Sequence, residues 1–408
     1  MTRRTDVLVV GAGPAGSAVA THLSRAGLRV VLADRAAFPR DKACSEYLSP
    51  ETVRLLDRLG VVGDLEAAGA QLLLGTRVIA PRGAELCGSF ARSAPAPWRP
   101  SGLSVRRTLL DARLVELARD SGAELVERTA VEDLLYEQGG VSGAVIRRAD
   151  GSRDRIHARL VIGADGLRSV VARRIGRRRH LPPSRMAFVA HVTGISGLDG
   201  FAEMHVSATG YVGLNRVAVD GEGRTVANVA LVIPRSRTRP AAGRIADFFF
   251  EELERFPGVR GRVPRQGVVR EILITGPFAA WSSRVVTDGA LLVGDAAEFF
   301  DPFTGEGIGT ALQGAEFAAA AATAALANGG RATAVRLAPY RVARRAAFAG
   351  RRAVERLVGY GMYFPALFDR AVERLERRGL SDTFIGVTGD YLPARAVLNP
   401  SFLARMVL

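Results

Sequence analysis

The chain has 408 residues, of which 48% are hydrophobic, so its length exceeds one ordinary domain and can bury the core of two or three lobes. Its net charge is +15, but the arginines are spread along the chain without basic tracts or interleaved aromatic residues, which argues against nucleic-acid binding. No apolar run approaches the ~20 residues that cross a bilayer, and Cys44 and Cys87 are too few for a disulfide framework. We expect a cytoplasmic protein without a transmembrane segment.

The first elements read as a strand, a glycine-rich turn, a helix and a second strand. Val7 to Val10 is an apolar, β-branched run that is typical of a buried parallel strand. Good helix formers follow from Ser17 to Ala26, Gly27 stands where a left-handed helix cap belongs, and Arg29 to Ala33 resumes a strand. This order predicts a βαβ unit.

The turn of this unit has the spacing Gly-x-Gly-x-x-Gly. Gly11 suits a tight turn, Gly13 lets the backbone approach a pyrophosphate, and Gly16 permits close packing of helix on strand. Asp34 ends the second strand, where a carboxylate can accept both ribose hydroxyls and disfavours a 2′-phosphate. The unit therefore predicts a dinucleotide site with contacts from Gly11, Gly13, Pro14, Ala15, Gly16, Asp34 and Arg35.

Two later strands, each running into an acidic glycine turn, decide which dinucleotide is bound. "LVIGADG" places Asp165, and "ALLVGDAA" places Asp295, at the carboxyl end of a strand, where open α/β sheets bind ligands. Asp295 can bond a ribityl hydroxyl, and the helix start after Gly305 can direct N–H groups towards N1 and O2 of a reduced flavin. The pattern predicts FAD, with contacts from Asp165, Gly294, Asp295, Pro302, Gly305, Gly307 and Ile308.

These three motifs, above all "GDAAEFFDPFTGEGIGTAL", resemble the superfamily of geranylgeranyl reductases and group A flavoprotein monooxygenases, nearest to the polyketide-tailoring flavoprotein hydroxylases. The resemblance implies an α/β fold of the p-hydroxybenzoate hydroxylase type. A glutathione-reductase-like, FAD-binding Rossmann domain would carry an inserted antiparallel-sheet substrate domain and a helical C-terminal segment. We expect the FAD-binding domain at 1–75, 102–180 and 285–331, the substrate domain at 76–101 and 181–284, and the C-terminal segment at 332–408.

The resemblance also implies further cofactor contacts. In "FPRDKACSEYLSP" it places Lys42, the only lysine of the chain, and Cys44 near the cofactor. The alternative for Lys42 is that it remains by chance in a chain that otherwise uses arginine. The alternative for Cys44 is that it is a small buried residue of the core. This branch of the family usually has glycine where Ser45 stands, so we expect a backbone conformation there that serine resists.

An arginine and a valine further along the chain match family positions that hold the cofactor. Arg107 in "VRRTLLDARLVELA" matches an arginine at a helix start, with its neighbour Arg106 as the alternative. Val131 matches a residue whose backbone holds the adenine. No second Gly-x-Gly-x-x-Gly follows a strand, so we expect NAD(P)H to dock transiently as the reductant.

Residues from about Arg185 to Ile274 alternate between apolar and polar, with glycine turns, which predicts an antiparallel sheet. Such a sheet would form a substrate wall over the flavin. Candidate cavity residues are Tyr47, Tyr211, Asn215 and Phe303, the alternative being that the aromatic ones belong to the core. No metal-ligand spacing is present and no catalytic side chain is assigned, so most of the chemistry would come from the cofactor.

The sequence favours a monooxygenase that hydroxylates an aromatic or polyketide-type small molecule through a C4a-hydroperoxyflavin. "GYVGLNRV" stands where prenyl reductases carry a tryptophan-containing lipid motif, and the tryptophan motif of flavin-dependent halogenases is also absent. A flavin-dependent reductase of carbon–carbon double bonds is the first alternative, favoured by Lys42 to Pro50 and by Arg173. A non-redox, FAD-bound cyclase is the second.

Residues 332–379 read as arginine-rich helices interrupted near Gly359 to Pro365. One face carries Leu357, Met362, Phe364 and Leu367. Two interpretations are open: a peripheral contact with a membrane or carrier protein, or packing of this face against the flavin lobe, which we favour.

Overall fold

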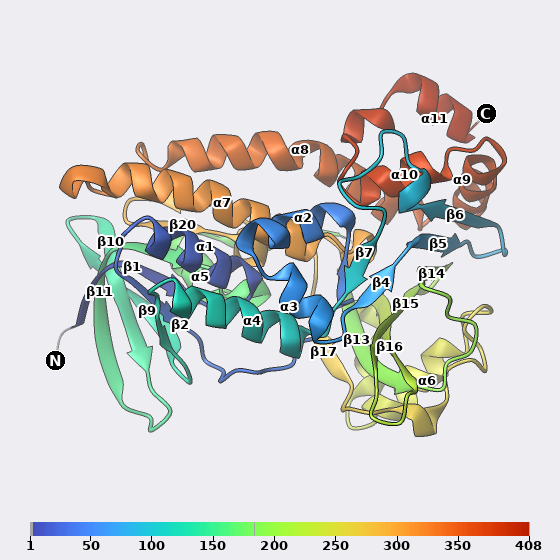
Figure 1. Cartoon of the computed structure of the whole chain (residues 1–408), viewed down its shortest axis with the longest axis horizontal. Helices are drawn as coiled ribbons and strands as arrows, with labels where there is room; N and C mark the ends of the chain where they lie inside the picture. Colours follow the sequence, from blue (N-terminus) through green and yellow to red (C-terminus); the bar gives the residue numbers. More distant parts are fainter. Residues whose placement is uncertain (1–2, 183, 408) are drawn as a thin grey trace.

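The computed structural model describes residues 3–182 and 184–407. One sheet and its helices, drawn from both the beginning and the later part of the chain, lie at the left, a second sheet lies at the right, and the helices that end the chain lie above this second sheet (Figure 1). This α/β architecture, with an antiparallel sheet and a helical C-terminal segment, confirms the predicted fold class.

The first sheet has a parallel centre because its strands are apolar on both faces. Its order is β19-β20-β11-β1-β2-β8, with the β9–β10 hairpin added to β11. Strand β1 pairs in parallel with both β2 and β11. The strands are β1 (Arg3–Val10), β2 (Val30–Ala33), β8 (Glu124–Val126), β9 (Ala130–Glu137), β10 (Gly140–Arg147), β11 (Arg153–Gly163), β19 (Val286–Thr287) and β20 (Ala290–Leu292).

The two faces of β1 bury alternate side chains. Val7 and Val9 pack in the core shared with the main helices, whereas Leu8 and Val10 pack with β9, β10 and the short helix α5 (Val170–Ile175). The helices of the first core are α1 (Pro14–Arg25), α2 (Pro50–Leu59), α3 (Val62–Ala67), α4 (Arg107–Asp120) and α7 (Gly307–Leu326). Covering both faces leaves the carboxyl ends of the parallel strands as the open edge.

The second sheet has the order β17-β13-β16-β15-β14-β5-β6, and only its β14–β5 pair is parallel. Leu214 and Leu231 face α6 (Ile245–Leu253), whereas Tyr211 and Val232 face the opposite way. The strands are β5 (Gly75–Ile79), β6 (Glu85–Ser89), β13 (Arg185–Thr193), β14 (Phe201–Ser207), β15 (Gly210–Val219), β16 (Thr225–Pro234) and β17 (Leu273–Thr275).

Two small sheets join the main layers. One has the order β3-β7-β4, with β3 (Tyr47–Leu48), β4 (Gln71–Leu73) and β7 (Gly102–Ser104). The other has the order β12-β18-β21, with β12 (Arg178–His180), β18 (Ala280–Ser282) and β21 (Glu298–Phe299). The second of these combines strands from both predicted domains, and the domain boundaries themselves stay a prediction.

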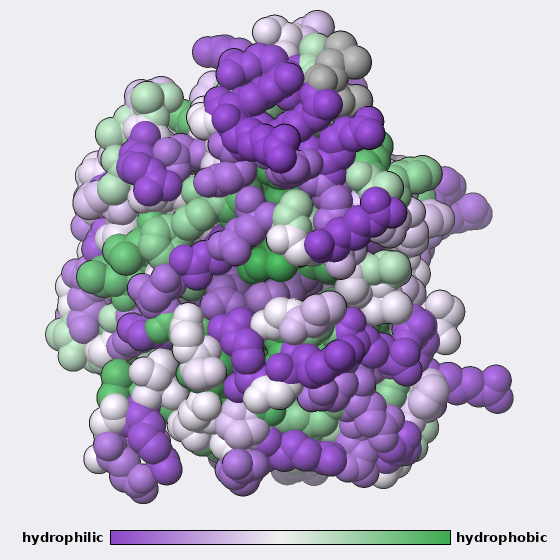
Figure 2. Space-filling model, turned by 90° about the vertical axis from the view of Figure 1, so that its right-hand side faces the viewer, coloured by the Kyte–Doolittle hydropathy of each residue, from purple (hydrophilic) through white to green (hydrophobic). Residues whose placement is uncertain are grey.

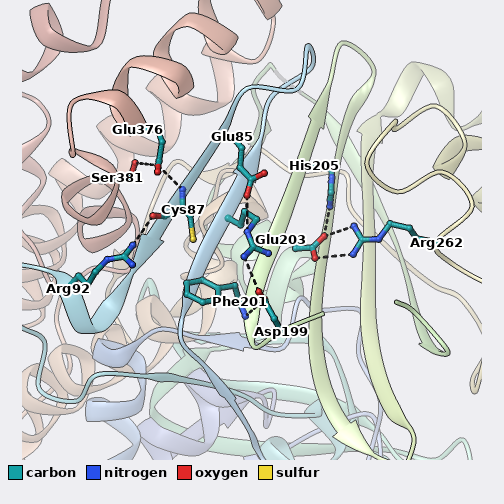
Figure 3. A network of polar contacts seen from close by, with 11 residues as sticks. Glu85, Cys87, Arg92, Asp199, Phe201, Glu203, His205, Arg262, Glu376 and Ser381 are labelled. Carbon is teal, nitrogen blue, oxygen red and sulfur yellow. Dashed lines mark hydrogen bonds and ion pairs between the residues drawn. The ribbon is translucent and has the colours of Figure 1, made fainter. Parts of the chain in front are cut away.

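The C-terminal helices pack on α7 and on the edge of the second sheet. They are α8 (Ala338–Gly361), α9 (Pro365–Arg377), α10 (Ser381–Thr388) and α11 (Pro400–Val407). Glu376 accepts hydrogen bonds from the Cys87 N–H at 3.0 Å and from the Ser381 hydroxyl at 2.8 Å, which ties α9 and α10 to β6 (Figure 3). The face of the molecule at this end is largely hydrophilic, with hydrophobic residues at the bottom of a hollow (Figure 2).

A buried carboxylate, that of Glu46, joins the first sheet to the second. Glu46 accepts a hydrogen bond from the Arg107 N–H at 2.9 Å and lies 2.7 Å from His191 Nε2 on β13. Asn228 on β16 donates to the same carboxylate at 3.1 Å. Burial alone would raise the pKa of Glu46, but the bond to and charge of His191, together with the bonds from Arg107 and Asn228, hold this pKa below its usual range.

The unusual backbone expected at Ser45 occurs one residue later. Glu46 has a φ of 58°, in the left-handed region that side chains rarely adopt, whereas Ser45 does not. The prediction of strain at Ser45 was therefore wrong by one position. The hydrogen bonds of Glu46 hold it in this conformation.

We predict that His191→Leu lowers the free energy of unfolding by about 3 kcal/mol, because it leaves the Glu46 charge buried without its main partner. Urea unfolding would measure the loss. His205→Leu is the matched control, since its partner Glu203 keeps two contacts with Arg262 at 2.8 and 3.0 Å (Figure 3). There we expect a loss of about 1 kcal/mol. Equal losses in the two variants would contradict the prediction.

Candidate functional site

The site begins at the turn that follows β1. Gly11 has a φ of 97°, and a Cβ there would lie 2.6 Å from the Ala164 carbonyl oxygen, while a Cβ on Gly16 would overlap the carbonyl oxygen of Gly11. The protein itself therefore requires both glycines. At Gly13 the nearest atom to a Cβ would be an Arg40 nitrogen at 3.6 Å, so the protein leaves room there for a ligand.

A groove of about 1280 Å³ runs over the carboxyl ends of the first sheet. Asp34 stands at its edge, and its carboxylate accepts the N–H groups of Ala12 at 2.7 Å and Ala36 at 2.8 Å. These bonds orient the carboxylate and leave it lone pairs for ligand hydroxyls. The predicted cofactor residues that line the groove are Gly11, Gly13, Asp34, Arg35, Lys42, Val131 and Asp165.

A second cavity adjoins the groove at Gly13 and Lys42 and extends between the first sheet and the second. We call it the chamber. Its lining from the first sheet side contains the predicted residues Gly13, Pro14, Ala15, Lys42, Cys44, Arg107, Gly294, Asp295, Pro302, Gly305, Gly307 and Ile308. Every predicted cofactor residue except Gly16, which is packed inside the turn, therefore lines the groove or the chamber.

Arginines held by one carboxylate gather beside Gly13. Arg107 makes a two-pronged contact with Asp111 at 2.8 and 2.7 Å, and Arg40 contacts the same carboxylate at 3.0 Å. Arg107 lines the chamber and Arg106 does not, so the structure brings the first of the two candidates to the site. Sequence reasoning missed Arg40, although it stands two positions before Lys42.

Lys42 lies where the groove meets the chamber. Burial lowers its pKa, and the positive charge of Arg107 lowers it further, against the opposing effect of Asp295. The two guanidinium groups beside Gly13, those of Arg40 and Arg107, outnumber the single carboxylate of Asp111 that holds them. This excess of positive charge at a helix N-terminus fits a pyrophosphate.

The acidic turns leave polar atoms free for a ligand. Asp165 Oδ2 accepts the Val170 N–H at 2.6 Å, while Asp165 Oδ1 is buried with no partner among the described residues. Burial raises the pKa of Asp165, opposed by the bond from Ser169. Arg178, which sequence reasoning also missed, donates to the carbonyl oxygens of Asp295 and Ala296 at 2.7 and 2.5 Å and fixes the second turn. The unpartnered oxygen of Asp165 fits a ligand that donates hydroxyl hydrogens.

The second sheet closes the chamber with an uncharged wall. Ala187, Val189, Ala230 and Val232 line it, and no charged residue of this sheet does so among the residues that the structure describes. Tyr211 also lines it and donates its hydroxyl to Asp301 at 2.6 Å; burial first, and Asp301 second, raise its pKa well above the usual value. The phenol therefore stays neutral.

A smaller pocket continues from the chamber towards α10. The two cavities share Met204 and Gly213, and the far end of the pocket is lined by Phe384 and Ile385. Three of the four candidate cavity residues, Tyr47, Asn215 and Phe303, line this pocket, and Tyr211 lines the chamber. The structure thus brings all four into adjoining spaces.

Two carboxyls, of the buried Glu306 and the partly buried Glu355, lie behind the chamber. Glu306, before α7, accepts the Ser49 and Thr52 hydroxyls at 3.2 and 3.3 Å, and burial raises its pKa to about 7. Glu355 on α8 lines a pocket that reaches Asp295, and burial raises its pKa to about 8, against the opposing charge of Arg351. Within 3–182 and 184–407, no group of three histidine, cysteine or acidic residues could hold a metal ion.

The pKa of Glu355 predicts a loss of stability as the pH rises. A folded-state pKa of about 8, above the ordinary 4.5, gives a contribution that is complete below about pH 4.5 and lost as the pH rises through 8. We expect Glu355→Gln to raise the free energy of unfolding relative to the native chain by about 2 kcal/mol at pH 9 and not at pH 4. Denaturant unfolding across this range would test it, with the exposed Glu373→Gln as control; parallel curves for all three chains would contradict it.

Comparison with known proteins identifies the cofactor. The model of the FAD binding domain family matches residues 4–356. The menaquinone reductase of Mycolicibacterium smegmatis is 34% identical over 331 residues, covering 78% of this chain and 76% of the relative. A digeranylgeranylglycerophospholipid reductase of Methanothrix thermoacetophila is 31% identical over 337 residues, covering 80% and 79%.

Solved structures show the same fold. The flavin-dependent brominase Bmp2 superposes with a TM-score of 0.80 at 21% identity, covering 95% of this chain and 93% of that one. PqsL of Pseudomonas aeruginosa, described as a probable FAD-dependent monooxygenase, gives a TM-score of 0.70 at 20% identity, covering 89% of this chain and 98% of that one. The family match and the identity to the reductases establish that this chain belongs to the FAD binding domain family and is an FAD-dependent oxidoreductase.

Proposed function

We propose that this chain reduces a carbon–carbon double bond of an apolar, isoprenoid-type substrate, with NAD(P)H as the transient source of electrons. The observation that carries the proposal is the uncharged wall of the chamber, which continues as a pocket towards α10. This wall suits a hydrocarbon chain. The pocket has one charged residue in its described lining, Glu203, and that carboxylate is already paired with His205 and Arg262. The two reductase relatives, a menaquinone reductase and a digeranylgeranylglycerophospholipid reductase, are named for isoprenoid substrates and support the same substrate class.

The groove and the first-sheet side of the chamber would hold FAD. The N–H groups at the start of α1, with Arg40 and Arg107, would bind the pyrophosphate, and Asp34 the ribose of the adenosine. Asp295 would bond the ribityl chain, and the N-terminus of α7 would lie at the pyrimidine edge of the ring. Bound there, FAD would supply hydride transfer.

The chain's own contribution would be a dry, oriented chamber and a proton. The wall of small aliphatic residues would exclude water beside the reacting carbon atoms. Of the proton-bearing groups that line the chamber, Tyr211 is bonded to Asp301, whereas Lys42 lies at the junction with the groove and has a lowered pKa. We assign the role of proton donor to Lys42, with the Cys44 thiol beside it.

Hydroxylation of an aromatic or polyketide-type molecule is the second candidate. The position that carries a tryptophan motif in prenyl reductases is here Gly213, which faces the chamber and leaves room for a ring. The neutral, bonded Tyr211 phenol weighs against it, because it offers no negative charge to activate a phenolic substrate. We therefore rank hydroxylation below reduction.

The deciding experiment incubates the FAD-loaded protein with NADH or NADPH and either menaquinone, a geranylgeranyl lipid or a phenolic polyketide, with and without oxygen. The proposal expects a product whose isoprenoid chain has lost one carbon–carbon double bond and gained two hydrogen atoms, formed without oxygen; reduction of the quinone ring alone, which gives the same gain in mass, would contradict it. A product that has gained an oxygen atom, with oxygen uptake, would establish the second candidate instead. Turnover with a flavin that cannot be reduced would exclude both and point to a non-redox reaction.

Substitution of Gly13 would separate cofactor binding from folding. A valine side chain fits the protein, whose nearest atom is 3.6 Å from the Cβ position, but it would occupy the space assigned to the pyrophosphate. We expect Gly13→Val to weaken FAD binding at least ~100-fold, or about 2.8 kcal/mol, with unchanged unfolding of the FAD-free chain. Flavin fluorescence titration measures it. Gly63→Val, where a Cβ meets nothing within 4 Å, should bind FAD normally.

Substitution of Gly213 would fill the chamber without touching the cofactor contacts. Its Cβ would make ordinary contacts with Met204 at 3.7 Å and Ala230 at 4.0 Å. We expect Gly213→Phe to raise KM about tenfold, equivalent to about 1.4 kcal/mol, while FAD binding stays the same. Gly221→Phe, in an open turn, serves as control. Unchanged steady-state kinetics in Gly213→Phe would mean that the substrate lies elsewhere.

A further inference from the structure

Exposed hydrophobic side chains concentrate where α8 ends and α9 begins. Tyr363 and Phe364 are 52% and 63% exposed, and Leu357, Tyr360 and Leu367 are exposed beside them in sequence. Of the four residues of the predicted apolar face, Met362 is buried and Leu357, Phe364 and Leu367 are exposed. The expectation that this face packs against the flavin lobe was therefore wrong for these three residues. We call Leu181, Leu357, Tyr360, Tyr363, Phe364 and Leu367 the α8–α9 patch.

Contacts with neighbouring residues keep the two tyrosine side chains of the patch at the surface. The Tyr360 hydroxyl donates to the Pro182 carbonyl at 2.9 Å, which brings Leu181 to the patch, and its ring packs on Phe300 with centroids 6.1 Å apart. The Tyr363 ring lies over the buried Arg185 guanidinium at 5.4 Å. These contacts fix the two tyrosine rings at the surface, and clustered exposure of this kind marks an interaction site.

The rim of the patch is basic. Between residues 353 and 370 the exposed charged residues are Arg356 and Arg370. The two acidic residues of that stretch turn inward: Glu355 lines the pocket behind the chamber, and Asp369 is buried and accepts the Arg82 N–H at 2.7 Å.

Strand β12, which leads into Leu181, adds a further arginine and an aromatic side chain near the patch. Its Arg179 lies over the half-exposed Trp281 ring at 6.0 Å, and the chain as a whole carries +15. Tyrosine, tryptophan and phenylalanine with an arginine rim have the composition of protein surfaces at lipid headgroups. An acidic protein partner would find the same rim, but a centre made of aromatic and leucine side chains favours insertion among acyl chains.

The patch lies one layer from the chamber. Arg185, which carries the Tyr363 ring, donates to Asp301 at 2.7 Å, and Asp301 accepts the Tyr211 hydroxyl at 2.6 Å. Tyr211 lines the chamber. In the described chain no helix is long and apolar enough to cross a bilayer, so a lipid surface would be met from one side.

We propose that the α8–α9 patch docks this protein on an anionic lipid surface, beside the chamber. The docking stands on the exposed aromatic side chains and their arginine rim. Only the purpose, delivery of an isoprenoid lipid to the chamber, rests on the proposed function. The tests below therefore measure binding and not turnover, so that the failure of either proposal can be told from the failure of the other.

Sedimentation of the FAD-loaded full chain with vesicles tests the docking. We expect binding to vesicles of phosphatidylcholine with phosphatidylglycerol, weaker binding to phosphatidylcholine alone, and weakening by salt. The triple variant Tyr363→Ser, Phe364→Ser, Leu367→Ser should bind the anionic vesicles at least ~10-fold more weakly. The control Val335→Ser, Val342→Ser removes two exposed valines outside the patch and should bind as the native chain does.

A second variant pair guards against misfolding of the first. Arg356→Glu, Arg370→Glu changes only exposed charges and should abolish the preference for anionic vesicles. Flavin absorbance and thermal unfolding should match the native chain in every variant. The proposal is overturned if the native chain does not bind, if the triple variant binds as well as the control, or if ultracentrifugation without lipid shows a dimer that the triple variant dissociates.

Discussion

The arrangement of the site depends on one buried carboxylate, that of Glu46. A charge without access to water must be compensated by fixed partners. Here those partners come from three separate elements: the first N–H of α4 at Arg107, His191 on β13 and Asn228 on β16. If the second sheet shifted relative to helix α4, the Glu46 carboxylate would lose hydrogen-bond partners while it stayed buried. The distance between the flavin side of the chamber and its uncharged wall is thereby fixed.

Two more buried carboxylates, each with several partners, lie around the chamber. Asp111 holds Arg40 and Arg107 beside Gly13, and Asp301 holds both Arg185 and Tyr211. In each case one carboxylate binds groups from distant parts of the chain. The charges on the first-sheet side would thus suit a pyrophosphate, while the phenol on the opposite wall is kept neutral. The proposed hydrophobic substrate and the charged cofactor would need such a division to share one cavity.

Sequence alone predicted the parts of this arrangement that are local. The βαβ unit ending at Asp34 and the helix break before Pro365 follow from periodicity, glycine spacing and proline, which act within a few residues. Glu46 and His191 escaped notice because they lie 145 positions apart and neither belongs to a motif. The exposure of Phe364 was missed for a related reason: an apolar helix face is visible in a sequence, but the element that covers it, or its absence, is a tertiary property.

The possible reactions are distinguished by the wall of the chamber and not by the residues that would bind FAD. The brominase and monooxygenase structures share this fold at about one-fifth identity, so the fold accommodates several chemistries. Oxygen transfer to a phenol gains from a base or a negative charge beside the ring, and the lining from the second sheet offers neither. Saturating a double bond needs hydride, a proton and the exclusion of water. Lys42, whose pKa is lowered by burial and by the charge of Arg107, lies at the junction of groove and chamber, where the proposed reduction would need its proton.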